Sequence, residues 1–170
     1  GYLKGTYARD KDAVVTSMLL AEMAAYYKVK GITLYDALQA LTTKYGCFQE
    51  ATDDVYMTGL YGQAQMEKIM EDLRAEPPAS IGGEQVVEVR DYRAQTITDL
   101  KTGKTTGTGL PKSNVMYFVT ETGNVVVFRP SGTEPKLKIY YLMRGEDNAA
   151  IEAQIERCRR QLHDMPDMAE

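Results

Sequence analysis

The stretch VVVFRPSGTEPKLKIYYLM, which spans residues 125–143, determines what fold this sequence predicts. β-Branched and aromatic residues favour strands, so the stretch predicts one strand over 125–129 and another over 137–143. Every second position of the later strand is apolar, at Leu137, Ile139, Tyr141 and Met143. Alternate residues of a strand point to opposite faces of a sheet, so these four are expected on one face. The opposite face then carries Lys138, Tyr140 and Leu142.

Further strands and a final helix are expected on both sides of this stretch. Residues 85–93 and 115–120 also carry β-branched residues and predict strands. The Gly- and Thr-rich residues 101–113 predict a loop or a loose hairpin. Asp147 is expected to cap a last helix, because a short carboxylate accepts hydrogen bonds from the free N–H groups of a first turn. The second half therefore predicts an α+β fold, with a roughly four-stranded, mainly antiparallel sheet and helix packing.

The first half of the chain predicts helices. Asp10 or Asp12 is expected to cap the first helix, and Gly31 to end it. Thr33 begins the second, with Asp36 three residues later, which is close to a capping box.

A third helix is expected over 62–74, and Pro77 and Pro78 after it prevent the helix from continuing. The composition then shifts to Pro, Gly, Ser and Ala over residues 75–83. Such a shift is typical of a linker, so a domain boundary is expected there.

Composition excludes several classes of protein. The 170 residues carry a formal net charge of −4, so a basic nucleic-acid surface is not expected. No apolar run reaches the roughly 18–20 residues that a membrane span needs. Cys47 and Cys158 are far apart, which predicts reduced thiols of a cytoplasmic protein rather than a disulfide framework or a zinc site. His163 lies in a polar segment and is expected on the surface. A chain that opens on Gly-Tyr is expected to be cut from a longer protein.

The loop between the two central strands has residue types that suit an anion. Arg129 offers a planar fork of donors for two phosphate oxygens. Ser131 and Thr133 add hydroxyl donors, and Gly132 can take a positive φ, which lets backbone N–H groups turn toward an anion. Glu134 would have to point away from the anion.

An ordinary surface turn is the alternative interpretation of this loop. A Walker-type loop is excluded, because the Gly-x-x-x-x-Gly-Lys spacing is absent. Lys136 adds positive charge beside the loop. With one histidine and two separated cysteines, any chemistry here would rest on carboxylates, lysines, arginines and hydroxyls.

Two segments resemble a known family. VVFRPSGTEPK, residues 126–136, resembles the phosphate-binding loop of the α-D-phosphohexomutases, which include phosphoglucomutases and phosphomannomutases. GYLKGTYARDKDA, residues 1–13, resembles the segment that directly follows the sugar-binding Glu-Glu-Ser loop of that family. The resemblance spans essentially the whole chain and is strongest to the bacterial phosphoglucomutases.

The resemblance implies a domain assignment. Residues 1–76 would be the helical end of the third family domain, an incomplete α/β domain, and 77–83 a linker. Residues 84–170 would be the fourth domain, whose sheet is like that of the TATA-box-binding protein. The catalytic serine and the Asp-x-Asp-x-Asp loop that holds Mg²⁺ in this family have no counterpart in the sequence, and the adjacent pair Asp53-Asp54 is expected in a helix or turn.

The resemblance also implies roles for residues. Arg129, Ser131, Gly132 and Thr133 would bind the phosphate of the sugar that does not react. Lys11 would lie near the substrate, with Arg9 as a weaker candidate beside it; no catalytic residue and no metal ligand is expected in this chain.

The parent enzyme would move phosphate reversibly between the 1 and 6 positions of a hexose, through a sugar 1,6-bisphosphate that reorients. This chain alone would be inactive and would need the N-terminal domains as partners. Two alternatives stay open at this point. The substrate could be a mannose, pentose or amino-sugar phosphate, or the chain could be a free-standing sugar-phosphate-binding module without catalysis.

Overall fold

The computed structural model describes residues 2–57, 59–132 and 134–164. The chain forms two compact units, Gly1–Gly46 and Cys47–Glu170. This division falls earlier than the predicted linker at 77–83, because residues 47–76 supply a strand and a helix to the second unit. The assignment of 1–76 and 84–170 to two domains of the family stays a prediction.

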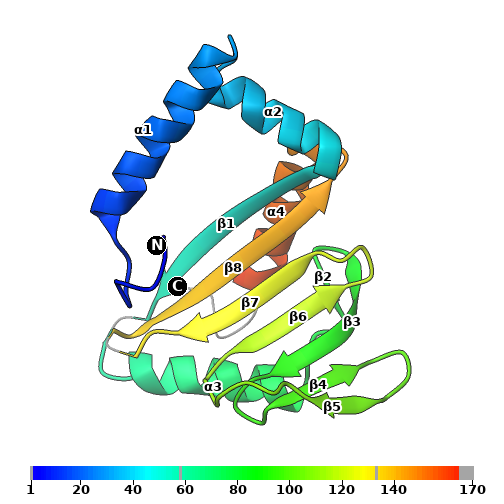
Figure 1. The fold of residues 1–170 in the computed structure, drawn as a ribbon. Coiled ribbons are helices and arrows are strands. Elements are labelled where there is room, and N and C mark those ends of the chain that lie inside the picture. The colour runs from blue at the N-terminus through cyan, green and yellow to red at the C-terminus, as the bar shows by residue number, and fades with distance from the viewer. Residues whose placement is uncertain (1, 58, 133, 165–170) are drawn as a thin grey trace. The chain divides into compact units, whose positions relative to one another are not determined.

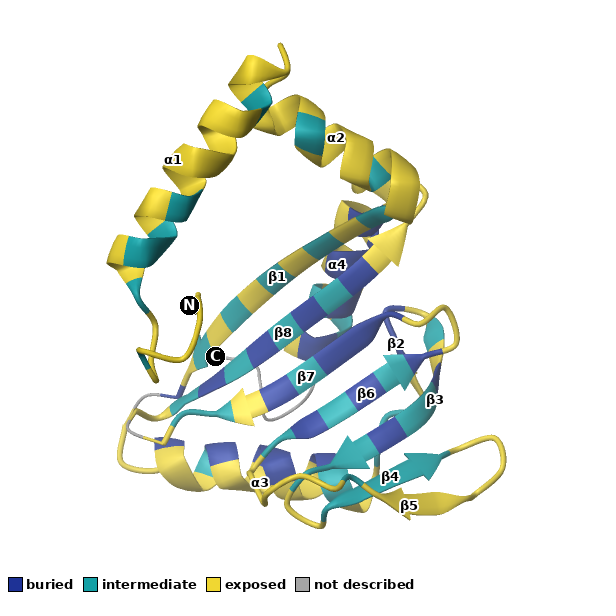
Figure 2. Ribbon diagram, in the orientation of Figure 1, coloured by how far each residue is buried: buried dark blue, intermediate teal, exposed yellow. Residues whose placement is uncertain are grey.

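The first unit contains helices α1 (Ala13–Val29) and α2 (Leu34–Tyr45). Asp12 is the cap of α1, and its carboxylate accepts hydrogen bonds from the N–H groups of Val14 and Val15, both at 3.0 Å. Thr33 and Asp36 form the complete capping box at the start of α2. Both predicted helix starts are therefore confirmed. No residue of either helix is buried, as the colouring in Figure 2 shows.

The second unit is built on one antiparallel sheet of eight strands (Figure 1). In chain order they are β1 (Cys47–Tyr56), β2 (Ser80–Ile81), β3 (Glu84–Asp91), β4 (Thr96–Asp99), β5 (Thr105–Gly107), β6 (Met116–Thr120), β7 (Val125–Pro130) and β8 (Lys136–Gly145). The spatial order is β1-β8-β7-β6-β3-β4-β5, with β2 paired to β3. The predicted fold class and antiparallel pairing are confirmed.

The predicted count of about four strands is wrong, as is the placement of Asp53 and Asp54 in a helix or turn. Both aspartates lie in β1, which pairs with β8 along ten residues. Acidic residues disfavour strands, but tertiary contacts decide here. Tyr141 donates a hydrogen bond to the Asp53 carboxylate, and the Arg159 guanidinium donates to both of its oxygens.

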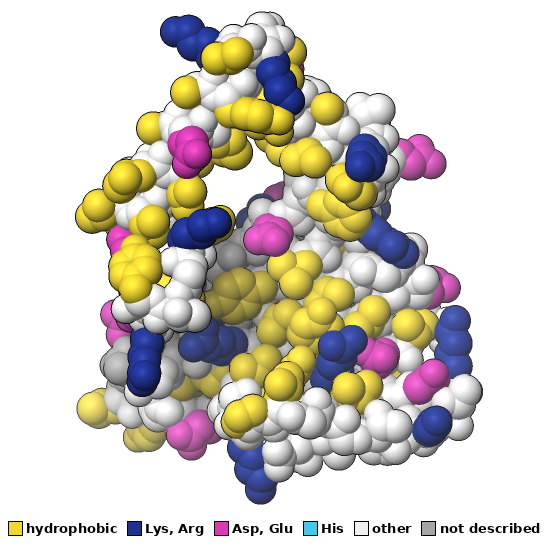
Figure 3. All heavy atoms as spheres, viewed as in Figure 1, with side chains coloured by type: hydrophobic (Ala, Val, Ile, Leu, Met, Phe, Trp, Pro, Cys, Tyr) yellow, Lys and Arg dark blue, Asp and Glu magenta, His cyan; other side chains and the backbone are white. Residues whose placement is uncertain are grey.

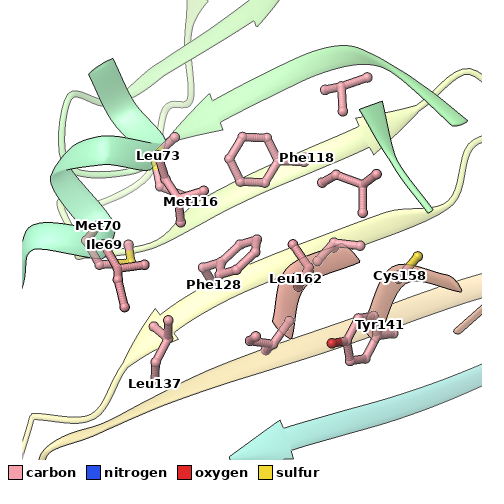
Figure 4. Close-up of a cluster of buried hydrophobic side chains, with 14 of the residues drawn as sticks. Ile69, Met70, Leu73, Met116, Phe118, Phe128, Leu137, Tyr141, Cys158 and Leu162 are labelled. Atoms are coloured by element: carbon pink, nitrogen blue, oxygen red, sulfur yellow. The ribbon is translucent and has the colours of Figure 1, made fainter. Parts of the chain in front are cut away.

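Helices α3 (Gly62–Ala75) and α4 (Asn148–His163) cover one face of this sheet. Asp147 caps α4 as predicted. The core lies between these helices and the strands, and Figure 4 shows side chains from both sides of it. At its centre Phe118 and Phe128 are fully buried, with ring centroids 5.7 Å apart and planes at 83°. The four alternate apolar residues of β8 are buried on this face, as their spacing predicts.

The remaining predictions of composition can be compared with the same structure. None of the helices in the described part of the chain is long and apolar enough to cross a membrane. Cys47 and Cys158 are free thiols, and Cys158 is buried. His163 is exposed at the end of α4.

Candidate anion-binding site

The predicted anion loop connects β7 to β8, and backbone hydrogen bonds fix its two sides. The Ser131 N–H donates to the Lys136 carbonyl at 2.9 Å, and the Lys136 N–H donates to the Glu134 carbonyl at 2.8 Å. The Pro135 carbonyl accepts from the Met57 N–H at 2.9 Å, which ties the loop to the segment after β1. The loop is therefore held by the sheet rather than free.

Arg129 lies at the end of β7 with an exposed side chain. It faces Lys138 directly across the β7–β8 pairing. No salt bridge of Arg129 is found within residues 2–57, 59–132 and 134–164. Its guanidinium is thus available to an anion from solvent.

The other predicted residues of the loop are Ser131, Gly132 and Thr133, and the structure describes the first two. The Ser131 hydroxyl oxygen accepts from the Glu134 N–H at 3.3 Å. Gly132 is exposed and has no positive φ, so it does not adopt the left-handed conformation that a glycine permits. A Cβ added at Gly132 would have no atom of the described residues within 4 Å. Thr133 lies outside the described residues.

Charges beside the loop are largely paired. The Lys136 ammonium lies 2.7 Å from a Glu134 carboxylate oxygen and 3.6 Å from Asp54. Its hydrogen bond to Glu134 raises the pKa of Lys136 well above its usual range. Lys138 lies 2.9 Å from Asp54, and this hydrogen bond lowers the pKa of that carboxyl. Glu134, which the sequence expects to point away from the anion, is therefore neutralised by Lys136.

A pocket of about 250 Å³ lies on the side of the loop that faces α3. It is lined by Gln63, Met66, Glu67, Asn114, Pro130, Ser131 and Gly132. Gln63 donates to the Glu67 carboxylate at 3.0 Å, and Asn114 accepts from Arg74. The sequence predicts a helix over 62–74, but it gives no signal that polar residues of this helix line a pocket with the loop.

A second, apolar pocket of about 310 Å³ lies on the sheet face opposite the core. Its lining residues are Tyr92, Ser113, Val115, Tyr117, Val127, Tyr140 and Leu142. Val127 and Tyr140 are two residues from Arg129 and Lys138 along their strands, so all four share this face. Figure 3 shows hydrophobic side chains gathered over the middle of the viewed face.

Lys11 and Arg9 belong to the first unit. Both are exposed, and the Lys11 ammonium lies 2.8 Å from the Asp10 carboxylate. The role of these two residues near a substrate stays a prediction.

The described residues contain no group of three His, Cys, Asp or Glu that could hold a metal ion.

The chain is similar to phosphoglucomutases. It is 35% identical over 156 residues to the phosphoglucomutase of Staphylococcus saprophyticus, which covers 92% of this chain and 28% of that protein. It is 34% identical over 147 residues to the phosphoglucomutase of Staphylococcus aureus, covering 86% of this chain and 26% of that protein. The chain thus spans about a quarter of the length of these relatives.

A solved structure shows the same fold. It is the exocytosis-sensitive phosphoprotein pp63/parafusin of Paramecium, described as a phosphoglucomutase in its open form, with a TM-score of 0.56 and 16% identity. The match covers 92% of this chain and 26% of that one. No protein-family model matches the chain. The similarity to the phosphoglucomutases nevertheless confirms the resemblance found in the sequence: the chain is related to a C-terminal part of proteins of the α-D-phosphohexomutase family.

Proposed function

We propose that this chain is the phosphate-binding part of a phosphoglucomutase-like enzyme. In this proposal Arg129, Ser131, Gly132 and Thr133 hold the phosphate of a phosphosugar that is not reacting. The observation that carries it is Arg129, an exposed guanidinium without a salt bridge in the described part of the chain, at the mouth of a loop fixed by backbone hydrogen bonds. The similarity to proteins named phosphoglucomutase supplies the substrate class.

The physical logic of such a site is remote binding. An interaction with a phosphate far from the reacting bond orients the reacting end and lowers the entropy cost of the reaction. A loop that binds either phosphate of a sugar 1,6-bisphosphate would also accept the reoriented intermediate. The chain would contribute binding and orientation only, while the serine and the Mg²⁺ ligands of the enzyme would belong to other domains.

Calorimetric titration of the 170-residue chain with glucose 1-phosphate tests the proposal. Arg129→Gln is expected to weaken binding about ten- to hundredfold, the usual value of a hydrogen bond to a charged group. Arg160→Gln is the matched control, since it removes the same charge from the exposed side of α4. Equal affinities of the two variants would contradict the role of the loop.

A coupled assay tests the second part of the proposal. The purified chain is expected to give no glucose 6-phosphate from glucose 1-phosphate, whether or not Mg²⁺ is added. Titration with mannose 1-phosphate in parallel is expected to give a similar affinity, since the proposed contacts are all to the phosphate and none is to the sugar. Turnover by the chain alone at an ordinary enzymatic rate would overturn the claim of inactivity.

A further inference from the structure

We propose that Lys136 is a positioning residue of the anion loop, which holds the Glu134 carboxylate away from Arg129 and so keeps Arg129 open to phosphate. The inference rests on the proposed function, because it explains how the same loop stays able to bind an anion. In this proposal Lys136 does not contact the phosphate and acts through Glu134.

Glu134 is an anion in a loop whose proposed ligand is also an anion. Its side chain is 55% exposed and belongs to the connection that follows Arg129. A carboxylate near Arg129 would repel a phosphate, and it could also take the place of the phosphate on the guanidinium. The loop therefore needs a partner for Glu134 other than Arg129.

The strand register brings two cations within reach of this carboxylate. Arg129 of β7 lies opposite Lys138 of β8, so Lys136 is the diagonal neighbour of Arg129 on the same face. Diagonal neighbours are about 7–8 Å apart, which long side chains can span. The Glu134 carboxylate lies 2.7 Å from the Lys136 ammonium, so Arg129 is the competing partner nearby.

Contacts with β1 fix Lys136 in the position that favours its own pairing with Glu134. Lys136 is the direct partner of Tyr56 across β1 and β8, and its ammonium lies 5.3 Å from the centre of the Tyr56 ring. The ammonium is also 3.6 Å from the Asp54 carboxylate, and the Lys136 side chain is only 14% exposed. A side chain held in this way loses little entropy when it binds Glu134, whereas the exposed Arg129 side chain would have to be ordered. Glu134 accordingly forms its salt bridge with Lys136, and Arg129 has none in the part of the chain that the structure describes.

Titrations of the 170-residue chain with inorganic phosphate test this role. Lys136→Met, which retains the aliphatic stem, is expected to weaken binding about tenfold, because it releases Glu134 to Arg129. Adding Glu134→Gln to Lys136→Met is expected to restore the wild-type affinity, since the competing carboxylate is gone. Adding Glu146→Gln instead restores the same net charge at an exposed position beyond the far end of β8, and binding should stay weak. Lys104→Met, in the turn between β4 and β5, makes the same change of net charge as Lys136→Met and is expected to have no effect.

The results distinguish this role from the proposed function. If Lys136→Met with Glu134→Gln binds as weakly as Lys136→Met alone, Lys136 does not act through Glu134 and the inference is wrong. If Arg129→Gln weakens binding but Lys136→Met does not, the inference is also wrong and the loop function stands. If circular dichroism shows that Lys136→Met is not folded, Lys136→Gln replaces it, and Glu134→Gln alone has to bind phosphate at least as tightly as the wild-type chain. If the wild-type chain binds no phosphate, both proposals fail.

Discussion

At the scale of single residues, Gly132 and Gly82 differ in whether a larger side chain would fit. A Cβ at Gly132 would have no atom of the described residues within 4 Å, and the φ of Gly132 is not positive. Gly82 has a φ of +60°, and a Cβ there would lie 2.5 Å from the Cys158 sulfur and 2.7 Å from the Gln154 amide nitrogen. The Gly82 N–H and carbonyl are also both bonded to α4, through Gln161 and Gln154. Packing therefore requires a glycine at position 82, whereas it does not require one at position 132.

A pair of alanine variants tests this difference. Gly132→Ala is expected to change the free energy of unfolding by no more than about 0.5 kcal/mol, as for an ordinary surface change. It should weaken phosphate binding if a ligand approaches the backbone there. Gly82→Ala is expected to cost about 1–3 kcal/mol, because overpacking adds to backbone strain. Urea denaturation with phosphate titration checks both, and a Gly82→Ala chain as stable as wild type would contradict the packing.

The sequence predicts those features whose physical cause lies within one helical turn. The caps of α1, α2 and α4 follow from a carboxylate or hydroxyl beside free N–H groups of one turn, and all three are confirmed. The conformation of Gly132 was not predictable in this way, because the loop is closed by hydrogen bonds from Lys136 and Met57. The Arg129–Lys138 pairing likewise follows from a register that loop closure sets.

At the scale of elements, β1 owes its place to partners that are distant in sequence. Its residue Asp53 accepts from Arg159 of α4, at 2.8 Å for the closest nitrogen, and from the Tyr141 hydroxyl at 3.0 Å. Burial and the adjacent Asp53 carboxylate raise the pKa of Tyr141 well above its usual range, so the phenol stays a donor at physiological pH. No pattern within residues 47–56 announces partners about a hundred residues later, which explains why the strand was not predicted.

Removing the Asp53 carboxylate tests this account. Asp53→Ala is expected to lower the free energy of unfolding by about 1–3 kcal/mol, because it leaves the Arg159 guanidinium and the Tyr141 hydroxyl without their acceptor. Glu50→Gln, at an exposed position of the same strand, is the control and should change stability little. Hydrogen exchange should show loss of protection first in β1. Equal stability of the two variants would mean that backbone pairing alone holds the strand.

At the scale of the whole chain, the two units differ in how their stability arises. Every residue of the buried apolar cluster comes from Cys47–Glu170. The helices α1 and α2 have no buried residue, although their caps are well formed. The sequence predicts α1 and α2, which have no buried residue, as well as α3 and α4, which pack on the sheet. It does not predict which of them acquires a core, since that depends on the surface each one meets.

Truncation tests this division and also tests whether the proposed phosphate site needs the first unit. A chain of residues 47–170 retains the complete buried cluster, β1 and the β7–β8 loop, so it is expected to unfold cooperatively near the midpoint of the full chain. It should also bind phosphate with the affinity of the full chain. Residues 1–46 alone are expected to show little helix by circular dichroism, because helices of this length are marginal in water without packing. Thermal melting and phosphate titration of both pieces provide the measurement. If residues 47–170 lost cooperative unfolding, the first unit would have to contribute to the core, and the independence of the unit that carries the proposed phosphate site would be wrong.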